Sequence, residues 1–160
     1  METVVLLGQA LLVGLLAGWL GIGVYENIRA PEVNGRLVSA VLSMRRVRDE
    51  RPEIYAVTKA NRIESPAIHA AIYRAVIAVE LVATALLILG ALLLLAAALG
   101  LAGAEGARIT AALGTIAFTA IWGAFLVGGQ WVHYWAAWKD TQFTHYFMTL
   151  WGAVTFVALT

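Results

Sequence analysis

An uninterrupted apolar run from Leu86 to Leu99 constrains the fold of this chain more than any other feature. Only leucine, isoleucine, alanine and one glycine occur in it. In hydrocarbon a chain must satisfy its backbone hydrogen bonds internally, which an α-helix does and an open strand does not. The run lies inside a hydrophobic span of residues 67–100, which is longer than the roughly 20 residues that cross a bilayer. This span therefore predicts a transmembrane helix.

The composition also favours a membrane protein. Of the 160 residues, 61% are hydrophobic and 13% are charged, whereas about a quarter of a soluble domain is charged. The net charge of +1 gives no argument for nucleic acid as a partner. The absence of cysteine excludes disulfides, thiolate metal ligands and cysteine nucleophiles. The first apolar segment has no preceding lysine or arginine and is too long for a signal peptide, so we expect it to be a retained span.

We predict an all-α fold in a single transmembrane domain, residues 1–160. The architecture is an integral membrane four-helix bundle with an amphipathic interfacial segment between helices 1 and 2. The predicted spans cover residues of about 3–24, 67–100, 108–130 and 143–160. The fourth of these is marginal in length. Ser65 followed by Pro66 is typical of an N-cap and first helical residue at the start of the second span.

The predicted interfacial segment, residues of about 25–66, mixes charges of both signs with three prolines. Apolar residues between Pro31 and Pro52 recur at helical spacing, which predicts a short amphipathic helix. We expect this helix to lie on the membrane surface or over the bundle. The basic stretch from Arg45 to Arg48 either meets lipid phosphates or belongs to a solvated face of mixed charge.

Small residues follow one another at a spacing of four in the first span, at Ala10, Gly14 and Gly18. This spacing lets two helix backbones approach closely in a membrane. The stripe indicates packing, either within the protein's own bundle or against another subunit.

A polar stripe enters the second span. His69, Tyr73, Glu80 and Thr84 fall within an arc of about 60° on a helix, and Glu80 lies about 16 Å along the axis from His69. An ionisable side chain is expensive in hydrocarbon and usually faces a bundle interior or a functional site. Glu80 is therefore either a hydrogen-bonding group that holds helices together, or part of a proton relay, an ion path, or a quinone or lipid-headgroup contact.

The three histidines, His69, His133 and His145, are expected at the same membrane face. Imidazoles near one plane suit a transition metal or haem, but no helix has a metal-ligand spacing of histidines. A cofactor such as haem, metal or quinone would be held by five residues: His69, Tyr73, Glu80, Gln130 and Trp131. The sequence requires no cofactor. The aromatic residues around Trp131 otherwise predict an anchor at the headgroup level.

Several short motifs come in an order and spacing that resemble a known family. They are Val41-Leu42-Ser43-Met44, Ser65-Pro66-Ala67-Ile68-His69, Glu80, Gly128-Gly129-Gln130-Trp131, Trp138, and Gln142-Phe143. Together they resemble the bacterial predicted small integral membrane proteins, a domain family of unknown function. The resemblance extends from the first span to the fourth.

This resemblance implies four transmembrane helices, multi-pass insertion in the bacterial inner membrane and no assigned activity. The family commonly has a glutamate where this chain has Gln130, so a two-carboxylate site with Glu80 is incomplete here. The family pattern also implies termini on the cytoplasmic side. The eight basic residues of the 25–66 segment oppose this, because basic residues favour the cytoplasmic side.

The leading functional hypothesis is a non-enzymatic accessory or structural subunit in the lipid bilayer, packed against a larger membrane complex or other copies of itself. The chain lacks a nucleophile–base pair, a phosphate-binding loop and an acidic cluster. One alternative is a redox or ligand-binding module holding haem, metal or quinone near His69 and Glu80. Another is a proton or ion pathway through Glu80. A transporter is disfavoured, since no span is broken by proline and no repeat is evident.

Overall fold

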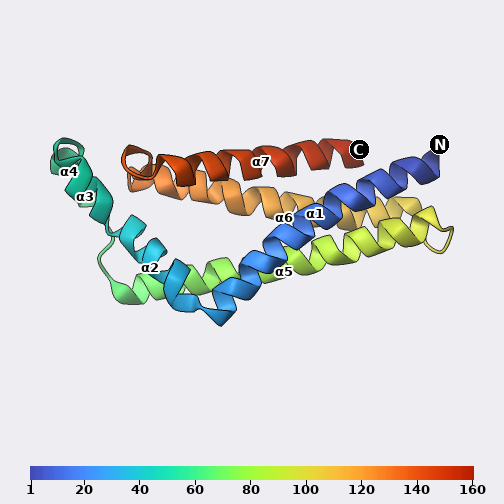
Figure 1. The fold of residues 1–160 in the computed structure, drawn as a ribbon, viewed down its shortest axis with the longest axis horizontal. Helices are drawn as coiled ribbons and strands as arrows, with labels where there is room; N and C mark the ends of the chain where they lie inside the picture. The colour runs from blue at the N-terminus through green and yellow to red at the C-terminus, as the bar shows by residue number, and fades with distance from the viewer.

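The computed structural model describes all residues 1–160 and contains helices and turns without strands (Figure 1). The prediction of an all-α membrane protein is confirmed. Its elements are α1 (Glu2–Arg29), α2 (Pro31–Leu42), α3 (Arg45–Glu50), α4 (Pro52–Thr58), the 3₁₀ turn η1 (Lys59–Asn61), α5 (Pro66–Ala98), α6 (Ala104–Trp131), the 3₁₀ turn η2 (Tyr134–Ala136) and α7 (Lys139–Leu159).

Three helices, α1, α5 and α6, are long and apolar enough to cross a membrane. The fourth long helix, α7, has 21 residues and is not among them. Its first half contains polar side chains, including Gln142 and His145, which lower its hydropathy. The four-span bundle expected from the sequence is therefore supported for three helices, and the fourth crossing stays a prediction.

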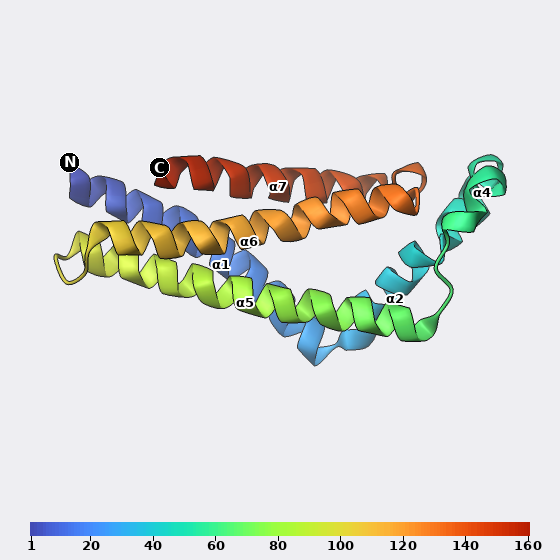
Figure 2. The same ribbon diagram turned by 180° about the vertical axis from the view of Figure 1, so that it is seen from behind.

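The long helices alternate in direction along the chain (Figures 1 and 2). Helix α1 packs on α5, α5 on α6, and α6 on α7. Both termini and the turn between α5 and α6 lie toward the same end of the molecule (Figure 1). The short helices α2 to α4 lie toward the opposite end.

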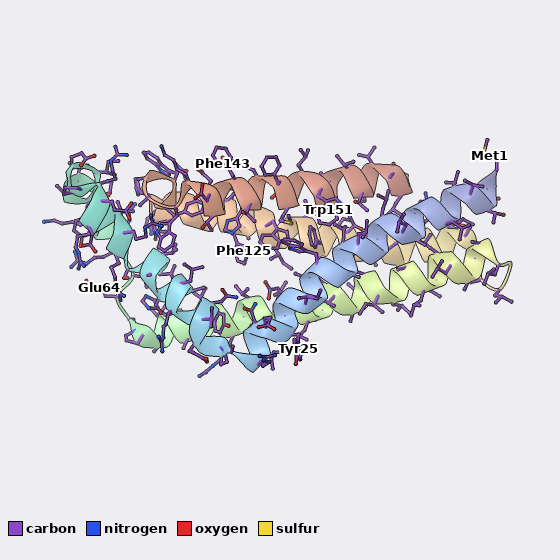
Figure 3. All side chains as sticks on the ribbon, viewed as in Figure 1. Met1, Tyr25, Glu64, Phe125, Phe143 and Trp151 are labelled. Carbon is purple, nitrogen blue, oxygen red and sulfur yellow. The ribbon has the colours of Figure 1, made fainter.

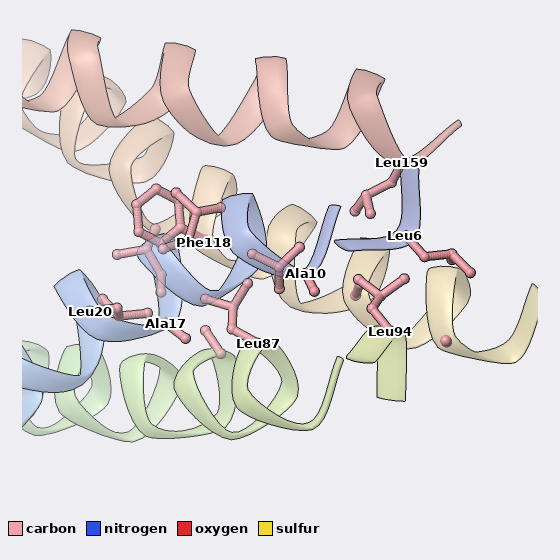
Figure 4. Packing of buried hydrophobic residues seen from close by; sticks show 14 of the residues in the cluster. Leu6, Ala10, Ala17, Leu20, Leu87, Leu94, Phe118 and Leu159 are labelled. Carbon is pink, nitrogen blue, oxygen red and sulfur yellow. The ribbon is translucent and has the colours of Figure 1, made fainter. Parts of the chain in front are cut away.

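One apolar core joins the long helices, and part of it is drawn in Figure 4. Two close approaches set how α5 and α6 pack. A Cβ added to Gly90 would lie 2.6 Å from the Ala111 Cα, and one added to Gly114 would lie 2.8 Å from the Leu87 nitrogen. Because only glycine avoids these clashes, the two positions fix the register between α5 and α6.

Residues 31–61 form what we call the α2–α4 lobe. The expected amphipathic helix is present as α2, and it ends where Met44 adopts a left-handed conformation (φ 52°). The lobe packs on the α6–α7 connection through a second small core: Met44, Val47, Val132, Tyr134, Ala136 and Ala137. The segment thus covers one end of the bundle, one of the two placements expected from the sequence.

Two further contacts attach the lobe to its neighbours. Asn61 and Trp131 exchange hydrogen bonds: Asn61 Nδ2 donates to the Trp131 carbonyl (2.9 Å) and Trp131 Nε1 donates to the Asn61 carbonyl (3.1 Å). The Arg46 guanidinium lies 4.4 Å from the centre of the Trp138 ring, a cation–π contact.

The predicted start of α5 is confirmed, since the Ile68 amide donates to Ser65 Oγ and Pro66 is the first helical residue.

Candidate functional site

Four polar side chains form a connected cluster, the Glu80 network, where α1, α2 and α5 meet. Asn27 Nδ2 donates to Glu80 Oε2 (3.0 Å), and Asn34 Nδ2 donates to Asn27 Oδ1 (2.6 Å). The Tyr73 hydroxyl donates to the Asn27 carbonyl (3.2 Å) and lies 3.4 Å from Asn27 Oδ1. Asn27 is therefore the hub through which the other three side chains are linked.

Three of the four side chains of the network are buried, and Asn34 is partly buried. Glu80 is 5% exposed, Asn27 7% and Tyr73 9%. A buried polar group without a partner costs about 1–3 kcal/mol, so the hydrogen bonds of the network offset the cost of burying these side chains. Thr84, one turn after Glu80, is also buried, and its hydroxyl has no hydrogen-bond partner.

The sequence of α1 places Asn27 in this position. The buried residues of α1 recur every three or four positions: Leu6, Gln9, Ala10, Val13, Leu16, Ala17, Leu20, Val24 and Asn27. Asn27 is the last member of that face. Pro31 follows, and the residue before a proline avoids the helical conformation, so α1 ends at Arg29 and the chain turns into α2. This turn brings the side chain of Asn34 into hydrogen-bonding distance of Asn27.

Glu80 is the last charged residue of α5 before a long uncharged stretch. Residues 81–98 of α5 contain no charged side chain, and these 18 residues rise about 27 Å, close to the thickness of a hydrocarbon core. On α1 the apolar sequence ends at Val24, and Glu26 and Asn27 follow. The hydrogen bond between Asn27 and Glu80 therefore joins the polar end of α1 to the charged residue that precedes the uncharged stretch of α5.

Asn27 and Asn34 are not among the site residues that the sequence predicts. The signal that would have identified Asn27 is its periodic place on the buried face of α1, which ends in a polar residue. Asn34 carries no such signal, because α2 has no buried residue and its contact depends on the turn at Ala30. The amides are hydrogen-bond donors to the carboxylate and to each other, and the network includes no second acid or base besides Tyr73.

The family model described as "Predicted small integral membrane protein (DUF2165)" matches residues 5–160. The chain belongs to this family. The resemblance noted in the sequence is thereby confirmed. No curated protein and no solved structure matches the chain.

In this family member the five residues expected to form one cofactor site are divided among three sets of contacts. Tyr73 and Glu80 both join the Glu80 network. His69 Nε2 lies 2.7 Å from the Ile63 carbonyl, so its ring fixes the segment that precedes α5. Gln130 is exposed at the far end of α6, and Trp131 is 59% exposed and paired with Asn61.

The three histidines expected to share a metal have different neighbours. His69 contacts Ile63, whereas His133 is next to Trp135, with ring centroids 6.2 Å apart. His145 stacks on Tyr134 at 5.8 Å. No group of three or more His, Asp or Glu side chains is placed to hold a metal ion. The three-histidine site is thus not assembled, because each ring is held by a different segment of the chain.

Aromatic rings surround His145 at the end of α6 and α7. Its ring lies 5.1 Å from Phe125 and 5.6 Å from Trp122, between centroids. The row continues through Phe118 to Trp151, which makes an edge contact with Trp19 of α1 at 6.3 Å. Phe125 and Trp151 are labelled in Figure 3. These contacts attach α7 to α6 and α1.

A second polar contact joins the helices at the terminal end. Gln9 Nε2 donates to the Ala158 carbonyl (2.8 Å), and Arg108 Nε donates to Gln9 Oε1 (3.1 Å). Gln9 is buried at 6% exposure. It therefore links α1 to α6 and satisfies one of the carbonyls that the end of α7 leaves without a helical partner.

A shallow apolar groove runs between α1 and α5 on the outside of the bundle. It is lined by Gly14, Ala17, Gly18, Gly21, Ile22, Ile88, Ala91 and Leu92. Around Gly14 and Gly18 an added Cβ would meet no atom within 4 Å. Gly21 instead lies against Thr84, whose Cγ2 would be 3.3 Å from such a Cβ. The small-residue stripe of α1 is thus only partly used inside the protein.

Proposed function

We propose that this protein is a non-enzymatic membrane subunit that binds a transmembrane helix of a partner in the α1–α5 groove. The observation that supports this is the open space at Gly14 and Gly18. Ala10 and Ala17 of the same helix are buried in the protein's own core. Two glycines four residues apart, facing outward over an apolar groove, suit close approach of another helix.

The Glu80 network supports a structural role for its residues in this proposal. Asn27 donates to Glu80 and accepts from Tyr73 and Asn34, so its polar groups already serve contacts within the chain. The redox or ligand-binding module and the proton pathway remain the alternatives. Both require Glu80, and both predict that Glu80→Gln abolishes an activity while the protein stays folded.

We further propose that the protein lies in the bacterial inner membrane and crosses it four times. Helix α7 runs alongside α6 for its length and carries exposed apolar side chains such as Phe147, Val154 and Val157. Its packing on α6 and α1 compensates for the polar residues in its first half.

The groove is tested by native mass spectrometry of the protein extracted from its own membranes in mild detergent. We expect additional mass from a partner polypeptide or a second copy. The double variant Gly14→Leu, Gly18→Leu fills the groove with two side chains. We expect it to lose the additional mass, because the partner helix no longer fits. The matched control is Gly8→Leu with Gly23→Leu, which adds the same side chains to α1 at two other open positions. A bare wild-type chain, or equal loss of mass in both double variants, contradicts the proposal.

A further inference from the structure

The segment that connects α4 to α5, residues 59–65, is fixed by contacts with α2, α5 and α6. The Ile63 amide donates to the carbonyl of the last residue of α2 (2.9 Å), and His69 Nε2 lies 2.7 Å from the Ile63 carbonyl. Asn61 exchanges two hydrogen bonds with Trp131 of α6 (2.9 and 3.1 Å). The segment is therefore an ordered part of the protein that can present side chains in a defined arrangement.

Four residues of this segment line an open pocket of about 420 Å³: Lys59, Ala60, Arg62 and Glu64. Glu64 marks the segment in Figure 3. Arg62 is positioned by its neighbours, because its Nε donates to Glu64 Oε1 (2.7 Å) and its Nη1 donates to the Tyr55 hydroxyl (3.5 Å). Two cationic side chains and one carboxylate thus line the same pocket.

Each charged side chain of the pocket keeps hydrogen-bonding capacity for a ligand. Lys59 makes no ion pair in the protein. The Arg62 side chain is 35% exposed and has more N–H donors than its two contacts use. The Glu64 side chain is 67% exposed, and only its Oε1 accepts from Arg62. The pocket therefore offers donors to an anion and one carboxylate oxygen to a cation.

The pocket lies at the level of the lipid headgroups. Helix α6 has no charged side chain from Ile109 to its end at Trp131, and these 23 residues rise about 34 Å, enough to cross a hydrocarbon core. Tryptophan gathers at the headgroup level of a membrane, and Trp131 is 59% exposed. Asn61, bonded to Trp131 in both directions, holds the pocket segment at that level.

The charges of the pocket indicate which headgroup fits. Guanidinium and ammonium groups bind phosphate oxygens, and a carboxylate bonds most strongly to a cationic donor. A headgroup that carries a phosphate and a primary ammonium meets both requirements. A trimethylated ammonium has no N–H to donate, and headgroup hydroxyls give Glu64 only neutral donors.

We propose that Lys59, Arg62 and Glu64 form a binding site for the headgroup of phosphatidylethanolamine. Lys59 and Arg62 bind the phosphate, and the second oxygen of Glu64 accepts from the ammonium. A lipid bound there attaches the connection between the α2–α4 lobe and α5 to the membrane surface. This site is separate from the α1–α5 groove and does not depend on the function proposed for the groove.

The test titrates phosphatidylethanolamine into the purified full-length protein in a neutral detergent and counts bound lipid by native mass spectrometry. A basic residue near a membrane surface contributes about fivefold to lipid binding, so Lys59→Gln with Arg62→Gln is expected to weaken binding about 25-fold. The matched control is Arg48→Gln with Arg51→Gln, two ion-paired arginines of the lobe that do not line the pocket. That variant is expected to bind within about twofold of wild type.

Glu64→Gln tests the ammonium half of the site separately. The amide oxygen still accepts a hydrogen bond but has lost the charge that strengthens it. The preference of the protein for phosphatidylethanolamine over phosphatidylcholine is therefore expected to fall about fivefold. A variant that merely disturbed the fold would weaken the binding of both lipids and leave their ratio unchanged.

Four results would overturn the proposal. One is phosphatidylethanolamine binding that is equal in the two double variants. Another is wild-type binding of phosphatidylcholine or phosphatidylglycerol that equals that of phosphatidylethanolamine. The third is an unchanged lipid preference in Glu64→Gln, and the fourth is displacement of the lipid by millimolar inorganic phosphate, which would identify a site for the free anion.

Thermal melting of each variant ensures that a loss of binding is measured on folded protein. If the double variant does not fold, Lys59→Gln alone replaces it, because Lys59 makes no ion pair that its loss could disrupt. This single variant is expected to bind phosphatidylethanolamine about fivefold more weakly than wild type. Wild-type affinity in it would contradict the role of Lys59 at the phosphate.

Discussion

The side-chain amide of Asn27 donates a hydrogen bond to the Glu80 carboxylate across 53 residues of sequence, at 3.0 Å. Helix α1 contributes the amide as the last member of its buried face, and α5 contributes the carboxylate just before its uncharged stretch. This bond, together with those from Asn34 and Tyr73, holds the corner between α1 and α2 against α5.

Replacing Asn27 by leucine is expected to lower the free energy of unfolding by about 2 kcal/mol, since it leaves the buried Glu80 carboxylate, Asn34 and Tyr73 without their shared partner. Chemical unfolding in detergent measures this change. Glu80→Gln is expected to cost less, because an amide oxygen still accepts from Asn27. Gln130→Leu, at an exposed position without a side-chain hydrogen bond, serves as the control. Equal stabilities of the Asn27 and Gln130 variants would contradict the structural role of the network.

Alanine at Gly90 or Gly114 is expected to destabilise the protein by about 1–3 kcal/mol, because each new methyl group would overlap the neighbouring helix. Gly8→Ala, where the added Cβ meets open space, is expected to be neutral or to stabilise α1 by up to about 1 kcal/mol. Thermal midpoints of the three variants compare the two cases. If Gly90→Ala has the same thermal midpoint as Gly8→Ala, then α5 and α6 do not pack at the observed register.

Gln9→Leu is expected to loosen the last turn of α7, because the Ala158 carbonyl and the Arg108 guanidinium both lose a hydrogen-bond partner. Hydrogen–deuterium exchange of the C-terminal peptide should accelerate, while exchange in the first half of α7 stays unchanged. Thr110→Val, which removes only a hydroxyl that bonds within its own helix, is the comparison. Equal exchange in both variants would show that Gln9 does not hold α7.

Tyr134 is expected to lose its proton at a higher pH than an exposed phenol does. Burial raises the pKa of Tyr134 from 10.0 to about 12. The unfolded chain therefore releases this proton first, and stability declines as the pH rises from 10 toward 12. Absorbance at 295 nm follows the titration, and Tyr134→Phe should remove the phenol that titrates last. A late phenol that persists in that variant would assign it to another tyrosine.

Single cysteines test the membrane crossings, because the chain has no cysteine of its own. With four crossings, Thr3→Cys, Leu101→Cys and Thr160→Cys are labelled by an impermeant reagent from one side, and Lys59→Cys and Lys139→Cys from the other. If α7 does not cross, Thr160→Cys reacts from the same side as Lys139→Cys. Which group of cysteines reacts from outside the cell also decides the orientation. The basic residues favour a cytoplasmic 25–66 segment, whereas the family pattern implies cytoplasmic termini.

The sequence by itself determined that this is a helical membrane protein and which segments form its long helices. The apolar run from Leu86 to Leu99 cannot be solvated, and in hydrocarbon only a helix satisfies its backbone. It also identified Tyr73 and Glu80 as members of one polar stripe, because both lie on the same side of a regular helix. These conclusions depend on local chemistry and helical periodicity.

Only the tertiary structure decided which residues contact the polar stripe of α5. Asn27 reaches Glu80 because α1 crosses α5 with Gly21 against Thr84, and Asn34 joins because Pro31 ends α1. The separation of the three histidines, and of Gln130 from Glu80, likewise follows from how the helices are placed along one another. Pairing between distant helices depends on crossing angle and register, which are set by a few close approaches such as Gly90 against Ala111. Periodicity within one helix does not contain that information.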